Sequence, residues 1–142
     1  MAVVQRKDYF TPRRVQQEYF SDFLSDFGVD FVKKDLKRAV NEDAVKQSIR
    51  NLLLTNRGDR FFNNTVGSDL RGLLFENASP ALEQVVGEYI RKTIENYEPR
   101  AEIIDIRVST EEDNNLIVAT IVFRIINKQE PIVLDLILNR IR

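Results

Sequence analysis

Apolar residues in the middle of the chain recur with the period of an α-helix. One stripe over residues 41–55 predicts an amphipathic helix, with Asn41 placed to cap its start. A second stripe, of about four turns, predicts a longer helix that begins at Ser79 and is ended by Pro99. Proline at position 80 suits the first helical position, because it leaves no N–H unpaired there. A shorter apolar run between the two stripes predicts a third, short helix.

Beyond Pro99 the apolar positions alternate with polar ones, which is the period of a β-strand. The alternating segments are residues 104–108, 116–126 and 132–138. Short polar runs separate them, so they are expected to form an antiparallel meander. The middle segment is apolar on both faces and therefore requires cover on both sides. The helices can cover one face, and the N-terminal residues or another protein must cover the other.

Residues 1–40 follow neither period and combine acids with many aromatic rings. The rings belong to Tyr9, Phe10, Tyr19, Phe20, Phe23, Phe27 and Phe31. Such rings often anchor interfaces, so this extended arm lies either on its own domain or on a partner. The whole pattern predicts an α+β fold, in which the arm (residues 1–40) precedes a single domain (residues 41–142) of about three helices packed on a three-stranded meander.

The amino-acid composition excludes several classes of protein function. The 142 residues include no Cys and no His, which excludes disulfides, thiolate nucleophiles and a histidine-based hydrolase triad. With 21 Lys and Arg against 22 Asp and Glu, the net charge of −1 argues against a nucleic-acid surface. No apolar run approaches the roughly 18 residues of a membrane span, and no signal peptide is evident. We expect a soluble intracellular protein with no cofactor, no metal and no membrane or nucleic-acid partner.

Carboxylates offer a possible enzymatic chemistry, because a glycosidase needs only two carboxyl groups at a set distance. Glu98 could act with Glu95, Glu76 or Asp59, but 22 acidic residues supply many such pairs. Glycines 58 and 67 do not form a phosphate-binding motif, since neither GxxxxGK[ST] nor GxGxxG occurs. These glycines are expected to shape a structured loop.

The segment Glu98-Pro99-Arg100 is the most informative short motif. Pro99 fixes the direction in which the chain leaves the long helix and holds two opposite charges on a rigid corner. Two interpretations remain open from the residues alone. Glu98 could pair with an internal arginine such as Arg60 while Arg100 caps the helix end, or the corner could present both charges to helices of a partner.

Several ordered segments together resemble the baseplate wedge protein family of contractile-tail phages, which is often labelled lysozyme-like and includes the sheath-nucleating subunit of the type VI secretion baseplate. The segments are Ile49–Arg60, Val66–Leu70, Leu74–Asn77 and Asn96–Arg100. The resemblance runs in order from about residue 41 to the C-terminus. It departs from the family mildly at Asp59, where a Glu is usual, and it is weakest in the arm.

The resemblance implies a structural, non-enzymatic adaptor whose fold is similar to the interlocking domain of sheath subunits. It implies that Glu98, Pro99 and Arg100 bind a helical bundle of neighbouring wedge subunits. The residues implied to shape and brace the adjoining loop are Thr55, Gly58, Asp59, Arg60 and Gly67. The residues implied to accept a strand of the tail sheath protein are Ile132, Leu134, Leu136 and Leu138.

The implied location is the tail baseplate of the virion, assembled in the host cytoplasm, with the first sheath ring templated on this protein. The arm would reach tube-side baseplate proteins. The alternative function, from the lysozyme-like label, is a peptidoglycan hydrolase that uses paired carboxylates.

Overall fold

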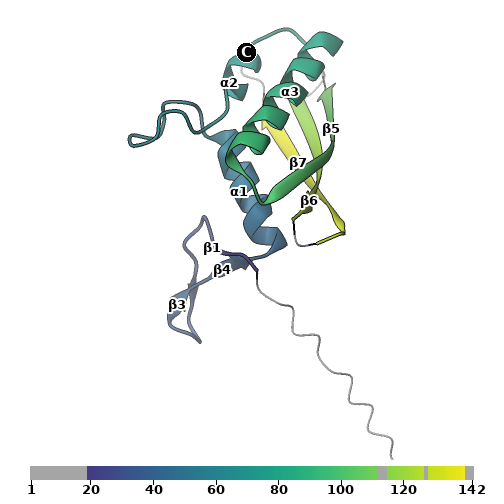
Figure 1. Cartoon of the computed structure of the whole chain (residues 1–142). Helices are drawn as coiled ribbons and strands as arrows, with labels where there is room; N and C mark the ends of the chain where they lie inside the picture. Colours follow the sequence, from purple (N-terminus) through teal and green to yellow (C-terminus); the bar gives the residue numbers. More distant parts are fainter. Residues whose placement is uncertain (1–18, 112–114, 127, 140–142) are drawn as a thin grey trace, which may run out of the picture.

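The computed structural model describes residues 19–111, 115–126 and 128–139. It consists of a three-stranded antiparallel sheet with helices on one face and two small strand pairs, one of which lies beside the first helix (Figure 1). The elements are β1 (Ser21–Phe23), β2 (Val29–Asp30), β3 (Asp35–Leu36), β4 (Arg38–Val40), α1 (Glu42–Leu54), α2 (Leu70–Leu73), α3 (Pro80–Tyr97), β5 (Ala101–Glu111), β6 (Leu116–Ile125) and β7 (Pro131–Asn139). The predicted mixture of helices with an antiparallel sheet is confirmed.

The main sheet has the strand order β5-β6-β7, so each strand pairs with the next one in the chain. Its register is shown by the row in which Ile106, Ile121 and Leu134 are opposite one another. A shift in register between Ile103 and Asp105 marks a bulge in β5. Beyond this bulge the side chains of β5 alternate in step with those of β6 up to the end of the strand.

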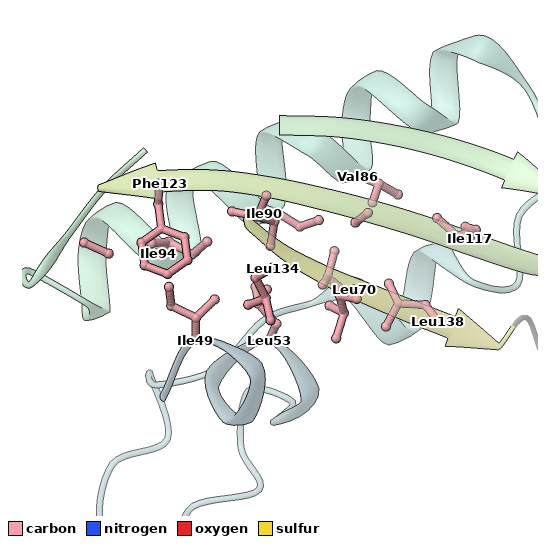
Figure 2. Close-up of a cluster of buried hydrophobic side chains, with 14 of the residues drawn as sticks. Ile49, Leu53, Leu70, Val86, Ile90, Ile94, Ile117, Phe123, Leu134 and Leu138 are labelled. Carbon is pink, nitrogen blue, oxygen red and sulfur yellow. The ribbon is translucent and has the colours of Figure 1, made fainter. Parts of the chain in front are cut away.

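The core lies between this sheet and the three helices (Figure 2). It is built from alternate positions of the strands and from the apolar stripes of the helices, as the two periods require. Its fully buried side chains include Val45, Ile49, Val86, Ile90, Ile94, Ile117, Ile121 and Phe123. Burial of each large side chain contributes about 1.5–3 kcal/mol. None of the described helices is both long and apolar enough to cross a membrane.

Two helix starts differ in their chemistry. Ser79 caps α3 as expected, because its hydroxyl oxygen accepts a hydrogen bond from the backbone N–H of Leu82 at 3.1 Å. Asn41 immediately precedes α1, but its side chain makes no capping hydrogen bond. Instead its Oδ1 atom accepts from the backbone N–H groups of Tyr19 at 2.8 Å and Phe20 at 3.3 Å. The predicted cap is therefore an anchor for the chain that precedes the helix.

The described part of the arm forms strands that the sequence pattern did not predict. β1 pairs with β4 and β2 pairs with β3, both antiparallel. Phe20 packs against the core, whereas Phe23, Phe27 and Phe31 are 59%, 67% and 89% exposed. Phe20 therefore lies on its own domain, whereas Phe23, Phe27 and Phe31 face solvent. The portion predicted for residues 1–18, which includes Tyr9 and Phe10, lies outside the described residues.

The face of the sheet that points away from the helices is covered by none of the described segments. Its apolar side chains include Val133 and Ile137, which are 51% and 62% exposed. A polar row crosses the same face, where Thr120 donates a hydrogen bond to Asp135 at 2.8 Å. β1 and β4 contact α1 instead (Figure 1). The described part of the chain therefore does not supply the expected second cover.

Substitutions at two isoleucines should separate the two faces of the sheet. Ile121→Ala should lower the free energy of unfolding by about 2–4 kcal/mol, because it leaves a cavity in the core. Ile137→Ala should lower it by less than about 1 kcal/mol, because that side chain already faces solvent. Urea denaturation of both variants measures the difference. Equal losses would contradict the assignment of the two faces.

Candidate functional site

The corner after α3 is built by the backbone before any side chain contributes. Glu98 leaves the helical region, with φ −126° and ψ 77°, as expected for a residue that precedes proline. Its N–H still donates to the Ile94 carbonyl at 2.8 Å, and its carbonyl accepts from the Ala101 N–H at 3.2 Å. The chain therefore turns directly from the last turn of α3 into β5. Pro99 lies exposed at the tip of this turn.

Glu98 and Arg100 form a two-point ion pair inside the corner. Nε of Arg100 lies 2.6 Å from Oε1 of Glu98, and its second nitrogen donates to Oε2 at 2.9 Å. The hydroxyl of Ser48, on α1, also donates to Oε2. The Glu98 side chain is only 3% exposed, so both of its oxygens are satisfied by protein groups rather than by water.

Arg100 extends the same network to the arm. A terminal nitrogen of its guanidinium lies 3.1 Å from Oδ2 of Asp22 in β1, and the group lies over the ring of Phe20 at 5.5 Å from the centroid. A cation over an aromatic face adds to the attraction. The Arg100 side chain is 24% exposed, so a fraction of the guanidinium still faces solvent. Glu98 and Arg100 together thus join α1, the α3–β5 corner and β1.

The protonation states follow from these contacts. Burial by itself raises the pKa of the Glu98 carboxyl, but the hydrogen bonds from Arg100 and Ser48 and the charge of Arg100 outweigh it, and the pKa lies below its usual 4.5. The hydrogen bond to Glu98 raises the pKa of Arg100, against the opposing effect of burial. Both groups are therefore charged at neutral pH.

These contacts identify the ion-pair partner of Glu98, which the sequence alone left open. Glu98 pairs with Arg100, its neighbour at the corner, and not with Arg60. No local pattern marked Asp22 or Phe20 as members of the network, since they are nearly 80 residues from the corner. Ser48 offered a weak signal, because its hydroxyl lies on the otherwise apolar stripe of α1.

The loop after α1 is held by backbone contacts at its base. Thr55 donates through Oγ1 to the Asn51 carbonyl at 2.7 Å, and its own carbonyl accepts from the Ser68 N–H at 2.8 Å. Gly67 has φ +138°, and a Cβ atom at this position would lie 2.7 Å from the Thr55 carbonyl oxygen. Only glycine allows the two ends of the loop to approach this closely.

The other residues predicted to brace the loop differ in whether they make contacts within it. Oδ2 of Asp59 accepts from the backbone and side-chain nitrogens of Asn56, both at 3.2 Å. Gly58 has φ +89° and donates to the Asn64 carbonyl at 3.0 Å. Arg60 is exposed and makes no hydrogen bond or ion pair with the residues that the structure describes. Arg60 therefore has no bracing contact in the described part.

A side-chain contact from α3 connects the loop to the corner. The hydroxyl of Tyr97, the residue before Glu98, donates to the Thr65 carbonyl at 2.6 Å. The structure thus brings the loop and the corner together at the same end of α3. The sequence carries no local signal for this hydrogen bond, because Tyr97 continues the apolar spacing of α3.

The predicted strand-acceptor residues lie on β7, at one edge of the sheet. The side chains of Ile132, Leu134, Leu136 and Leu138 are 3–6% exposed and belong to the core. β7 pairs with β6 on one side, and no other described strand pairs with it. Any group that these residues offer to a further strand is therefore the backbone of β7.

Two hollows flank β7 where it passes the helices. One, of about 340 Å³, is lined mainly by apolar side chains of α1 and α2, including Leu53, Leu54 and Leu70, beside Ile137. The other, of about 410 Å³, lies near Leu134 and is lined by apolar side chains together with polar and charged residues. The charged residues lining it are Asp43, Lys46 and Arg50.

A sequence model of the Baseplate wedge protein gp25 family matches residues 39–130. The chain belongs to this family. One member, the baseplate wedge protein gp25 of Enterobacteria phage T4, is 29% identical over 113 residues, which cover 80% of this chain and 85% of the phage protein. The matched region contains the helices, the loop, the corner, β5 and β6.

Solved structures share the fold of this gp25-family chain. A Geobacter sulfurreducens protein named as a tail lysozyme superposes with a TM-score of 0.66 at 20% identity, covering 71% of this chain and 92% of that one. A chain of the anti-feeding prophage baseplate gives 0.61 at 18% identity, covering 83% of each chain. A chain of the postcontracted pyocin R2 baseplate gives 0.51 at 20% identity, covering 77% and 95%.

Family membership makes this chain a baseplate wedge protein of a contractile tail system, and its phage relative is named for that structural role. The corner of this family member is also poorly suited to acid catalysis. A glycosidase acid must hold a proton near neutral pH, which requires a raised pKa. The pKa of Glu98 is lowered instead, and its oxygens are occupied by Arg100 and Ser48.

The lowered pKa of Glu98 predicts a pH dependence of stability. The carboxylate stabilises the fold above about pH 4.5, its value in the unfolded chain, and this contribution is lost as the pH falls through the lower folded value. At pH 7, Glu98→Gln should lower the free energy of unfolding by about 2–3 kcal/mol. Below pH 4.5 the difference from the wild-type protein should shrink.

Urea denaturation between pH 7 and pH 3 measures this effect. Glu95→Gln is the matched control, because Glu95 lies on the same helix with its side chain 55% exposed, 3.9 Å from Arg91. If the loss of unfolding free energy in Glu98→Gln stayed constant over this pH range, the charge of Glu98 would not be what stabilises the fold.

Proposed function

We propose that this chain is a structural subunit that clamps neighbouring wedge subunits at its Glu98-Pro99-Arg100 corner and templates the first ring of tail sheath along β7. The observation that carries the proposal is the edge position of β7, a strand of nine residues whose outer side no other described strand occupies. An open edge of this length can accept an extended segment by strand addition. We also propose that the fold of this chain is similar to that of the interlocking domain of sheath subunits.

At the corner, the division of roles is supported by burial. Glu98 is enclosed and holds the guanidinium of Arg100 in one orientation, while Pro99 and the outer part of Arg100 remain accessible. A preorganised guanidinium has donors left for the carboxylates or terminal carbonyls of a helical bundle. In this proposal Glu98 positions Arg100, and the contact with the wedge bundle is made by Pro99 and Arg100.

Along β7, the proposed acceptor surface has two parts. The backbone of β7 would supply hydrogen bonds to a sheath strand. The buried side chains of Leu134 and Leu138 would set the distance between β7 and α1. Inward side chains of the added strand would then enter the two hollows beside β7. The hollow near Ile137 suits an apolar residue, and the one near Leu134 combines apolar surface with the charged groups of Asp43, Lys46 and Arg50.

The arm and the setting complete the proposal. The exposed rings of Phe23, Phe27 and Phe31 can dock on tube-side baseplate proteins. The uncovered outer face of the sheet is a further surface that neighbours in an assembly can cover. The protein would be assembled into virions in the host cytoplasm, and its role would require no catalysis.

A substitution at the exposed tip of the corner tests wedge binding without breaking the ion pair. Pro99→Asp should leave the melting temperature within a few degrees of wild type, because Pro99 is exposed, yet reduce the amount of this chain in purified baseplates at least tenfold. Quantitative immunoblotting of particles from the encoding genome measures this.

Pro80→Asp is the control for this test, at the other end of the same helix. Position 80 is also exposed, and an acid there is compatible with the positive end of the helix dipole. Full incorporation of Pro99→Asp would rule out the corner as the wedge contact.

A charge in the apolar hollow beside β7 tests sheath initiation. Leu54→Lys should preserve the fold, since Leu54 is 55% exposed, but oppose entry of an apolar side chain from the sheath strand. Electron microscopy should then reveal baseplates with attached tubes and this chain present, but few sheaths. Val85→Lys, on the outer side of α3, should give normal sheaths. Normal sheath on the Leu54→Lys particles would contradict the proposed site.

A further inference from the structure

The loop between α1 and α2 carries two adjacent aromatic rings at its tip. Phe61 and Phe62 are 95% and 105% exposed, so neither packs on the described part of the chain. In Figure 1 this loop projects away from the helices and the sheet. Single exposed apolar residues are common on protein surfaces and need no explanation. Two large exposed rings on consecutive residues of a projecting loop leave much apolar area in water, which is typical of an interface anchor.

The loop that presents these rings is held in a defined shape. Its two ends meet at the close approach of Gly67 to Thr55, and Gly58 is hydrogen-bonded across the loop to Asn64. Tyr97 attaches the loop to α3 through the Thr65 carbonyl. Ordering a flexible segment opposes binding, so a loop already braced in this way loses less entropy when its tip is captured.

The charges of the loop indicate the kind of surface that captures it. Arg57 pairs with Asp69 at 3.3 Å, and Asp59 is hydrogen-bonded to Asn56. Residues 56–69 therefore carry two positive and two negative side chains, which cancel. A neutral loop gains little from an anionic lipid surface, which attracts clusters of basic residues. Arg60, exposed and without a polar partner among the described residues, remains available for one carboxylate.

We propose that Phe61 and Phe62 insert into an apolar pocket of another protein subunit of the baseplate, and that a carboxylate on the rim of this pocket pairs with Arg60. Aromatic side chains enclosed in pockets, with a charged rim, are the residues that commonly dominate binding energy. The surroundings fit, since chains of this fold occur in the anti-feeding prophage and pyocin R2 baseplates. This anchor is separate from the Glu98-Pro99-Arg100 corner and from β7.

The double variant Phe61→Ser/Phe62→Ser tests the proposal. Its melting temperature should match that of the wild-type chain, because the rings contribute no packing in the described part. Its incorporation into purified baseplates should fall at least tenfold. The matched control is Val85→Ser/Tyr89→Ser, which removes two exposed apolar side chains from α3 and should assemble normally. Incorporation of the loop variant equal to that of the control would overturn the proposal.

Two further measurements identify the occupant of the loop tip. A photoreactive p-benzoylphenylalanine at position 62 should crosslink to a different baseplate subunit in purified particles. A crosslink confined to this chain would instead indicate an internal contact and overturn the proposal. Vesicles of phosphatidylcholine and phosphatidylglycerol should not bind the purified protein. Vesicle binding that disappears in the double variant would assign the rings to a lipid surface and also overturn it.

Discussion

The buried ion pair between Glu98 and Arg100 is the interaction on which the arrangement of the other elements depends. A carboxylate enclosed in protein is tolerated only when every oxygen is satisfied, and here Arg100 and Ser48 do so together. Because these groups come from α1 and from the α3–β5 corner, neutralising the charge also fixes the position of α1 against the corner. Asp22 and Phe20 extend that constraint to β1. One charge that must be paired thus sets the relation of three parts of the chain.

The second general feature is that the described helices all lie on one face of a three-stranded sheet. A sheet covered on one side normally alternates apolar and polar residues, but β6 keeps Leu116, Val118 and Val122 on its outer side. Polar contacts interrupt this apolar area, including the ion pair between Arg124 and Glu102 at 2.7 Å. The outer face is therefore compatible with water in a free subunit and with a neighbour in an assembly.

The local signals in the sequence predicted the local structure well. Ser79 with Pro80 marked the start of α3, and the change of period after Pro99 marked the strands. Contacts between distant residues were not predictable in the same way. The Asn41 side chain binds the backbone of residues 19 and 20, and the partner of Arg100 on β1 is Asp22; neither has a local pattern. The exposure of Phe61 and Phe62 was equally hidden, since apolar composition alone does not distinguish a buried ring from a presented one.

The construction of the corner has a consequence for the order of folding. Asp22 lies 78 residues from Arg100, and Ser48 lies 50 residues from Glu98. The β5–β6 and β6–β7 pairings close short loops, whereas the corner must close long ones, at a greater entropic cost. We expect the corner to be completed late, after the sheet and α3 have formed. A partner that recognises the finished corner would thereby discriminate against chains that are only partly folded.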